Sequence, residues 1–272
     1  MRLLDRIILG YVAIVSVVAA LRIPGNPACW WILGAHLLTV ALILLLQRPG
    51  LGPVGRVIRE VYPVVLLILF YSELDILNGV QVVTHDPTVQ RWEMALFGEQ
   101  VSRTLWWRYP SRAASALFHA VYWSYYLLLL TPVVYFAARR DWLSLRRTIF
   151  VVIVTLLACY LVFLGFPVAG PYYEFAWPEP WFLDNAPARL VYATLASGSS
   201  FGAAFPSSHV AATIAATSGA WRGDRRLGLV MLPLAAALAF SVVYCQMHYG
   251  VDALTGVAVG AAAWWLGGKY RE

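Results

Sequence analysis

Residues 205–252 read FPSSHVAATIAATSGAWRGDRRLGLVMLPLAAALAFSVVYCQMHYGVD. The stretch holds two apolar runs joined by a short basic turn at 222–226. His209 stands at the head of the first run, and His248 and Asp252 follow the second. One pass down and one pass back place both polar clusters on the same side of a membrane. Histidine and carboxylate groups at the ends of hydrophobic helices are costly to bury and usually serve a function.

The composition is that of a membrane protein. Of the 272 residues, 61% are hydrophobic and 12% are charged, about half the charged share of an ordinary soluble domain. Several apolar runs reach about 18 residues, the length that a helix needs to cross a bilayer. The sequence therefore predicts an all-α fold, a polytopic bundle of membrane helices, with a single membrane domain over residues 1–272. The net charge of +6 lies in short loops, where it sets topology, so no nucleic-acid partner is expected.

About eight transmembrane helices are predicted, at residues 3–21, 28–47, 58–78, 113–137, 148–166, 207–221, 227–246 and 251–267. A signal peptide is the less favoured alternative for the first run, because 19–22 is a poor cleavage site and a second span follows directly. Residues 79–111 mix charged and aromatic side chains, which is typical of an amphipathic segment lying in the membrane interface. The loop at 167–204 is rich in proline and aromatic residues, and a short surface helix is expected at 187–196.

Eight passes place both termini on one side of the membrane. The termini and loops of that side hold 14 Lys and Arg residues, whereas the other side holds 6. Because basic residues are retained in the cytoplasm, the termini are predicted to be cytoplasmic, in a plasma or inner membrane. His209, His248 and Asp252 are then expected at the extracytoplasmic face.

The spacing of His248 and Asp252 indicates a functional pair. Residues four apart share one face of a helix. A carboxylate that accepts from one imidazole nitrogen fixes the tautomer and directs the lone pair of the other nitrogen, which makes the histidine a nucleophile or a base. The alternative is a buried polar pair that joins helices or relays protons in a transporter.

The cluster at 206–209 is predicted to begin a helix, because proline favours the first helical position and serine favours the cap. Free amides and the hydroxyls of Ser207 and Ser208 would then form an anion site suited to phosphate. His209 lies within one turn of that site and could protonate a leaving oxygen. A plain helix cap with an interfacial histidine is the alternative.

Taken together, the two clusters resemble the type 2 phosphatidic acid phosphatase superfamily, whose motifs include Pro-Ser-x-His and, later, His-x-x-x-Asp. The gap of 39 residues between the histidines fits, Ser241 matches the serine that opens the third motif, and residues 243–256 are similar throughout. The resemblance implies that His248 attacks phosphorus and forms a phosphohistidine, that Asp252 orients it, and that His209 acts as acid and then base. It implies no metal and no cofactor, and the three unpaired cysteines predict no metal site.

The resemblance covers roughly residues 85–258, the predicted catalytic core, and leaves the helices of 1–80 without an assigned role. Two features of the family are missing. Val242 stands where an arginine is usual, and the only lysine is Lys269, so the Lys-x6-Arg-Pro motif is absent. This disfavours the vanadium haloperoxidases and favours the inositol phosphorylceramide synthase and sphingomyelin synthase branch. Looser similarities to the inositol phosphorylceramide synthases occur at 85–87 with 96–98, at 122–126 and at 166–173.

Other side chains must then hold the phosphate. The predicted substrate-binding residues are Ser207, Ser208, Arg108, Arg112 and Tyr244. Arg103 and Arg189 are further candidates for holding the phosphate, and His119 is a candidate for the cavity wall. Glu73 and Asp75 are candidates for binding a polyol. Each of these side chains also suits an interfacial or interior position.

The predicted activity is transfer of a phospho-headgroup, as by an inositolphosphotransferase, from a phospholipid or sphingolipid-type substrate to an alcohol. Two alternatives remain open. One is a lipid or prenyl phosphate phosphatase that uses water as the acceptor. The other is a non-catalytic lipid transporter or scramblase with the same fold, against which the complete set of two histidines and an aspartate argues.

Overall fold

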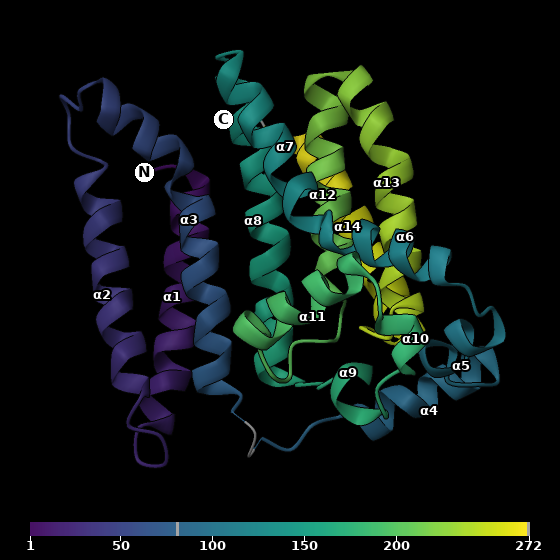
Figure 1. The fold of residues 1–272 in the computed structure, drawn as a ribbon. Helices are drawn as coiled ribbons and strands as arrows, with labels where there is room; N and C mark the ends of the chain where they lie inside the picture. Colours follow the sequence, from purple (N-terminus) through teal and green to yellow (C-terminus); the bar gives the residue numbers. More distant parts are fainter. Residues whose placement is uncertain (80–81, 271–272) are drawn as a thin grey trace.

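The computed structural model describes residues 1–79 and 82–270, which form an all-α bundle without a strand (Figure 1). Within this described part, nine helices build the bundle: α1 (Leu3–Arg22), α2 (Cys29–Leu45), α3 (Pro53–Leu77), α6 (Arg112–Trp123), α7 (Tyr125–Ala138), α8 (Trp142–Gly165), α12 (Ser208–Gly223), α13 (Arg225–Tyr244) and α14 (Gly250–Lys269). Five further helices gather toward one end: α4 (Asp86–Phe97), α5 (Val101–Arg108), α9 (Pro171–Glu174), α10 (Pro180–Leu183) and α11 (Ala186–Gly198).

Helix α12 lies at the centre of the bundle. It packs against α7, α8, α13 and α14, and most of its residues are buried. Its buried face consists largely of small side chains such as Ala211, Ala215 and Gly219, which let neighbouring backbones approach closely. A Cβ at Gly219 would collide with Thr148 of α8. The beginning of α12, which carries His209, is therefore held by several helices at once.

Helices α1, α2 and α3 form a separate layer beside α8 (Figure 1). At the end near the chain termini, Glu60 of α3 accepts hydrogen bonds from Arg2 (3.1 Å) and from Arg146 of α8 (2.7 and 2.8 Å). At the other end, Asn78 Nδ2 donates to Phe163 O (2.8 Å). Polar contacts thus join this layer to the rest of the bundle at both ends of α8.

Glu73 and Asp75 already have partners within the fold. The buried Glu73 carboxylate lies 3.1 Å from His36 Nε2, and His36 Nδ1 lies 2.7 Å from Ser16 Oγ. Asp75 accepts a hydrogen bond from Phe201 N (3.3 Å). The expectation that these carboxylates bind a polyol therefore finds no support in their positions.

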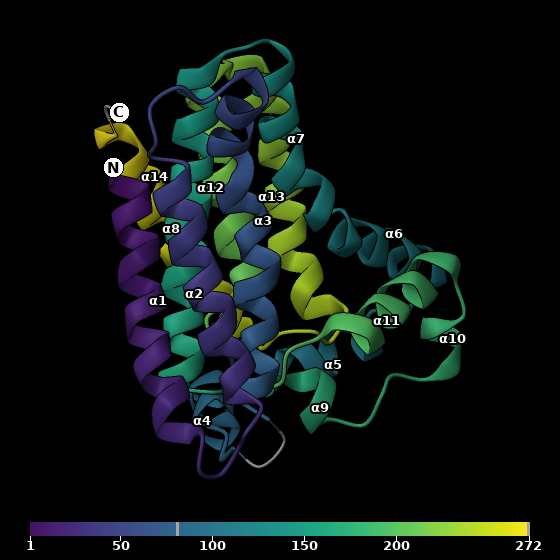
Figure 2. The ribbon, with the colours of Figure 1, turned by 90° about the vertical axis from the view of Figure 1, so that its left-hand side faces the viewer.

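The predicted all-α polytopic bundle is confirmed, and helices occupy all eight predicted positions. Among the residues that the structure describes, however, length and hydropathy support four membrane crossings, by α1, α8, α13 and α14, or five if α6 and α7 count as one. Helices α2 and α12 are short, at 17 and 16 residues, and α3 carries five charged side chains within its 25 residues. Both termini lie at the same end of the bundle (Figures 1 and 2).

The predicted single span at 113–137 is wrong in one respect, because it is broken into α6 and α7 with a bend of 42°. Ser124 stands at the break, and its hydroxyl donates to Val121 O (2.6 Å), a type of bond that bends helices. Helix α6 consequently turns away from the direction of α7 and runs beside α11 (Figure 2). The bend leaves Tyr122 and Tyr125 in contact with the start of α12.

The predicted amphipathic segment at 79–111 forms α4 and α5. Exposed Leu96 and Trp107 suit an interface, but Asp86 and Glu93 are fully buried instead of facing water. Glu93 accepts hydrogen bonds from the amides that begin α14, at Gly250 (3.0 Å) and the next residue (2.9 Å), and burial raises the pKa of its carboxyl. Helix α4 therefore supplies the N-terminal cap of α14. In the following loop, α11 confirms the helix expected at 187–196.

Candidate active site

His209 and His248 meet where α12 and α14 begin. His209 Nδ1 lies 3.3 Å from His248 Nε2, although 39 residues separate the two along the chain. Asp252 Oδ2 lies 3.5 Å from His248 Nδ1, and Asp252 O accepts a hydrogen bond from Ser207 N (3.0 Å). The two sequence clusters therefore form one site.

The closest partner of His248 Nδ1 is the carbonyl oxygen of Ala204, at 3.0 Å. A carbonyl only accepts, so Nδ1 carries the proton and Nε2 keeps its lone pair. His209 Nδ1–H then donates to that lone pair, and His209 Nε2 accepts from Tyr122 OH (3.3 Å). The Asp252 carboxylate lies farther from His248 Nδ1 than the Ala204 carbonyl does, at 3.5 Å, and from there its charge can stabilise an imidazolium at His248.

Asp86 holds the backbone next to Ala204, whose carbonyl oxygen anchors His248 Nδ1. Its carboxylate accepts hydrogen bonds from Ala169 N and Gly170 N (2.8 Å each) and from Tyr249 OH (3.0 Å). Burial and the charge of Asp86 raise the pKa of the Tyr249 phenol, which keeps its proton available for donation. The same loop pairs with the extended segment that carries Ala204, since Ala204 N donates to Val168 O (2.9 Å).

Asp86 was not among the predicted site residues. It lies, however, in one of the stretches, 85–87 and 166–173, that are loosely similar to the inositol phosphorylceramide synthases. These two stretches contact each other. His85 N donates to Pro167 O (2.8 Å), and the His85 ring stacks on Phe166 with centroids 4.2 Å apart. The two stretches that resemble the same family, although distant in the sequence, are thus in contact in the structure, and their shared resemblance was the signal that could have pointed to this part of the site.

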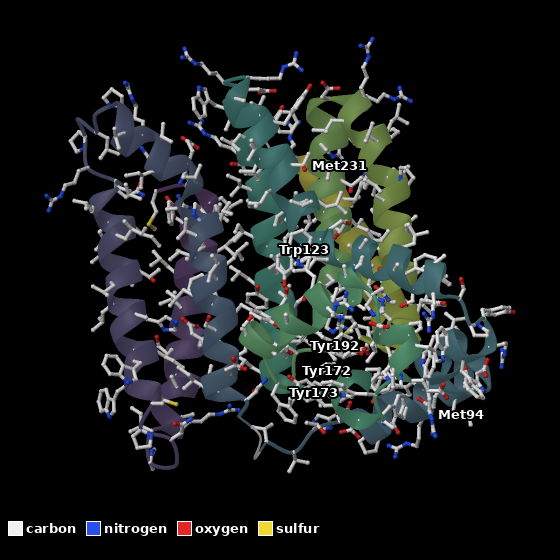
Figure 3. All side chains as sticks on the ribbon, in the orientation of Figure 1. Met94, Trp123, Tyr172, Tyr173, Tyr192 and Met231 are labelled. Atoms are coloured by element: carbon white, nitrogen blue, oxygen red, sulfur yellow. The ribbon has the colours of Figure 1, made fainter. Side chains whose placement is uncertain are left out.

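A pocket opens beside the two histidines. Aromatic and hydroxyl-bearing side chains dominate its wall, and none of the lining residues in the described part of the chain is Arg or Lys: Tyr71, Tyr122, Ala169, Tyr172, Tyr173, Leu195, Ser199, Ser200, Ala203, Ala204, His209, Met247 and His248. Figure 3 shows Tyr172 and Tyr173 close to Tyr192 of α11, and the rings of Tyr172 and Tyr192 are 5.8 Å apart.

The predicted substrate-binding arginines do not line this pocket. Arg108 forms a bidentate ion pair with Glu99 (2.6 and 2.9 Å), which lowers the pKa of that carboxyl, and its side chain is 54% exposed. Arg112 is exposed at the first position of α6. Arg103 lies over the Phe175 ring, and Arg189 pairs with an exposed aspartate.

Tyr244 and His119 are also outside the pocket wall. The Tyr244 hydroxyl donates to Tyr109 O (3.1 Å) and its ring packs among other aromatic rings. His119 is buried and its Nδ1 lies 2.8 Å from Ser115 O. Tyr244 thus satisfies its hydroxyl away from the histidine pair, whereas His119 fills space within α6 and its neighbours and, among the described residues, finds no hydrogen-bond partner for its buried Nε2.

Ser207 caps α12, as the sequence predicted for a helix start. Its Oγ accepts from Val210 N at 3.4 Å, and Ser208 is the first residue of the helix. Within the described chain, the amides of Ser208 and His209 have no hydrogen-bond acceptor, as is usual in a first helical turn. These amides lie beside the histidine pair and are the nearest candidates for an anion.

No group of three or more His, Cys, Asp and Glu side chains converges as metal ligands would within residues 1–79 and 82–270. A polytopic helical bundle that gathers two histidines and a carboxylate where two helices begin defines an integral membrane enzyme of the phosphoester-cleaving class. A model of the PAP2 superfamily matches residues 87–266, more than half of the chain. The protein belongs to this superfamily, whose members are phosphatases or phosphotransferases. No curated protein and no solved structure gives a significant match.

Proposed function

We propose that the protein transfers a phospho-headgroup from a lipid phosphodiester to an alcohol through a phosphohistidine at His248. The observation that carries the proposal is the anchoring of His248 Nδ1 on Ala204 O, which directs the Nε2 lone pair toward His209 and the pocket. Membership of a superfamily of phosphatases and phosphotransferases argues against the alternative of a non-catalytic transporter or scramblase.

In the first step, His248 Nε2 attacks phosphorus while the bond from phosphorus to the lipid alcohol oxygen breaks. His209, protonated when the anionic substrate is bound, gives its proton to that oxygen. In the second step, the acceptor oxygen attacks phosphorus, His209 takes the acceptor's proton, and the bond from phosphorus to nitrogen breaks. The 3.3 Å contact between the rings leaves no room for phosphorus, so substrate must separate them.

The pocket wall favours a diester as the substrate. A phosphodiester carries one negative charge, whereas a phosphomonoester carries up to two at neutral pH. Tyrosine and serine hydroxyls, helix-end amides and one imidazolium can satisfy one charge, but a dianion would remain poorly compensated in a pocket whose described lining holds no Arg or Lys. The lining therefore supports the transferase over the phosphatase.

Hydrolysis is the second candidate, because Tyr173 of the pocket wall is 42% exposed and water can reach the site. Purified protein in lipid nanodiscs should be given phosphatidylinositol with an acceptor alcohol and, separately, phosphatidic acid. The transferase predicts headgroup transfer that disappears in His248→Ala, with little phosphate release from phosphatidic acid. Rapid phosphate release without headgroup transfer would refute the proposal and establish the phosphatase.

A further inference from the structure

A second, larger pocket lies at the opposite end of α8 from the histidines. It is lined by Arg56, Arg59 and Glu60 of α3, by Arg140 after α7, and by Trp142 and Arg146 of α8. The histidine site adjoins the other end of α8, where Phe166 packs on Phe205. Because α8 has 24 residues and is about 36 Å long, the two pockets are separate sites.

The charge of this pocket is strongly positive. Glu60, its only lining carboxylate among the described residues, already accepts hydrogen bonds from Arg146 and from Arg2. Within residues 1–79 and 82–270, Arg56, Arg59 and Arg140 form no ion pair, and the buried Arg59 Nε has no hydrogen-bond acceptor. Guanidinium groups gathered without counter-charges favour a bound anion, and their planar donors match phosphate.

Arg140 occupies an unusual backbone position. Its φ of 56° is left-handed, at the end of α7 where glycine is the common residue. Arg140 N donates to Ala137 O (3.0 Å), so the turn closes the helix. The chain thus carries an arginine where a glycine would fit the backbone better, and this side chain lines the pocket.

The rest of the wall is apolar. Pro53, Val57 and Ala137 supply aliphatic surface, and Trp142 is partly exposed, as tryptophans of the membrane interface are. A wall with arginines on one part and apolar side chains on another suits an amphipathic anion. We propose that this pocket binds the phosphate headgroup of an anionic phospholipid, in the leaflet opposite the histidine site, and thereby joins the α1–α3 layer to α7 and α8.

Titration of the purified full-length protein in mild detergent with short-chain phosphatidylglycerol and phosphatidylcholine, followed by native mass spectrometry, tests the proposal. Phosphatidylglycerol should bind at least about tenfold more tightly, since the choline cation of phosphatidylcholine cancels the charge of its phosphate and is repelled by the arginines of the pocket. Arg56→Ala and Arg140→Gly should each remove about tenfold of that affinity. Arg140→Gly relieves the left-handed backbone, so its effect cannot be assigned to misfolding.

Arg226→Ala is the matched control, because Arg226 is exposed at the same end of the bundle but outside the pocket. It should bind phosphatidylglycerol as the wild type does. Equal affinity for the two lipids, or an equal loss in all three variants, would overturn the proposal. Full displacement of phosphatidylglycerol by millimolar inorganic phosphate would overturn it in favour of a soluble anion. The readout is binding, so it is independent of the proposed enzymatic function.

Discussion

Replacement of Asp86 by alanine should weaken both the fold and the reaction. The carboxylate is fully buried and accepts hydrogen bonds from Ala169 N, Gly170 N and Tyr249 OH. Without it, two buried amides lose their acceptors at about 1–3 kcal/mol each, so the free energy of unfolding should fall by about 2–6 kcal/mol. The Tyr249 hydroxyl keeps a partner, because Gln90 Nε2 still donates to it (2.9 Å).

The effect on catalysis should appear in kcat. The loop held by Asp86 pairs with the extended segment that carries Ala204 O, the anchor of His248 Nδ1. A shift of about 1 Å in a reacting group can reduce rates by about 100-fold, so kcat should fall strongly while KM changes little. Asp86→Asn keeps one acceptor oxygen and should lose roughly half as much stability, because one amide remains satisfied.

Thermal unfolding in detergent and kinetics with a nitrophenyl phosphodiester measure both effects. Asp184→Ala is the matched control, because Asp184 forms an exposed ion pair with Arg189 that contributes about 0–1 kcal/mol. It should leave Tm and kcat almost unchanged. If Asp86→Ala unfolds at the wild-type temperature and keeps its kcat, the inferred support of His248 by this carboxylate is wrong.

Three further predictions concern the site and its orientation. His209→Ala should lose about 100-fold or more on an alkyl phosphoester but far less on a nitrophenyl ester, whose leaving group needs no proton; survival of nitrophenyl cleavage in His248→Ala with loss in His209→Ala would reverse the two roles. Ser207→Ala should lower the free energy of unfolding by about 1 kcal/mol through its lost cap and raise KM for the phosphoester, and an unchanged KM would place phosphate elsewhere. A cysteine introduced at 180–185 should react with an impermeant thiol reagent in intact cells, whereas one in the 139–147 loop should not, and the reverse pattern would contradict the positive-inside orientation.

The sequence by itself determined the helices and the meeting of His209, His248 and Asp252. Hydropathy over about 18 residues is a local property, so it located the bundle helices within a few positions. The turn at 222–226 sends the chain back, which brings both clusters to one end whatever the details of packing. The beginning of α12 near Ser207 followed from the local preference of serine for the cap, although Pro206 precedes the cap and does not hold the first helical position that the sequence predicted.

Only the tertiary structure decided which groups surround the histidines. The link from Asp86 to Ala169 spans 83 residues, and the anchor of His248 is a backbone carbonyl, which no residue type reveals. The ion pair of Arg108 with Glu99 keeps this predicted phosphate ligand away from the pocket. Such contacts depend on how helices pack against one another, whereas spacing along the chain reports only what lies on one face of one helix.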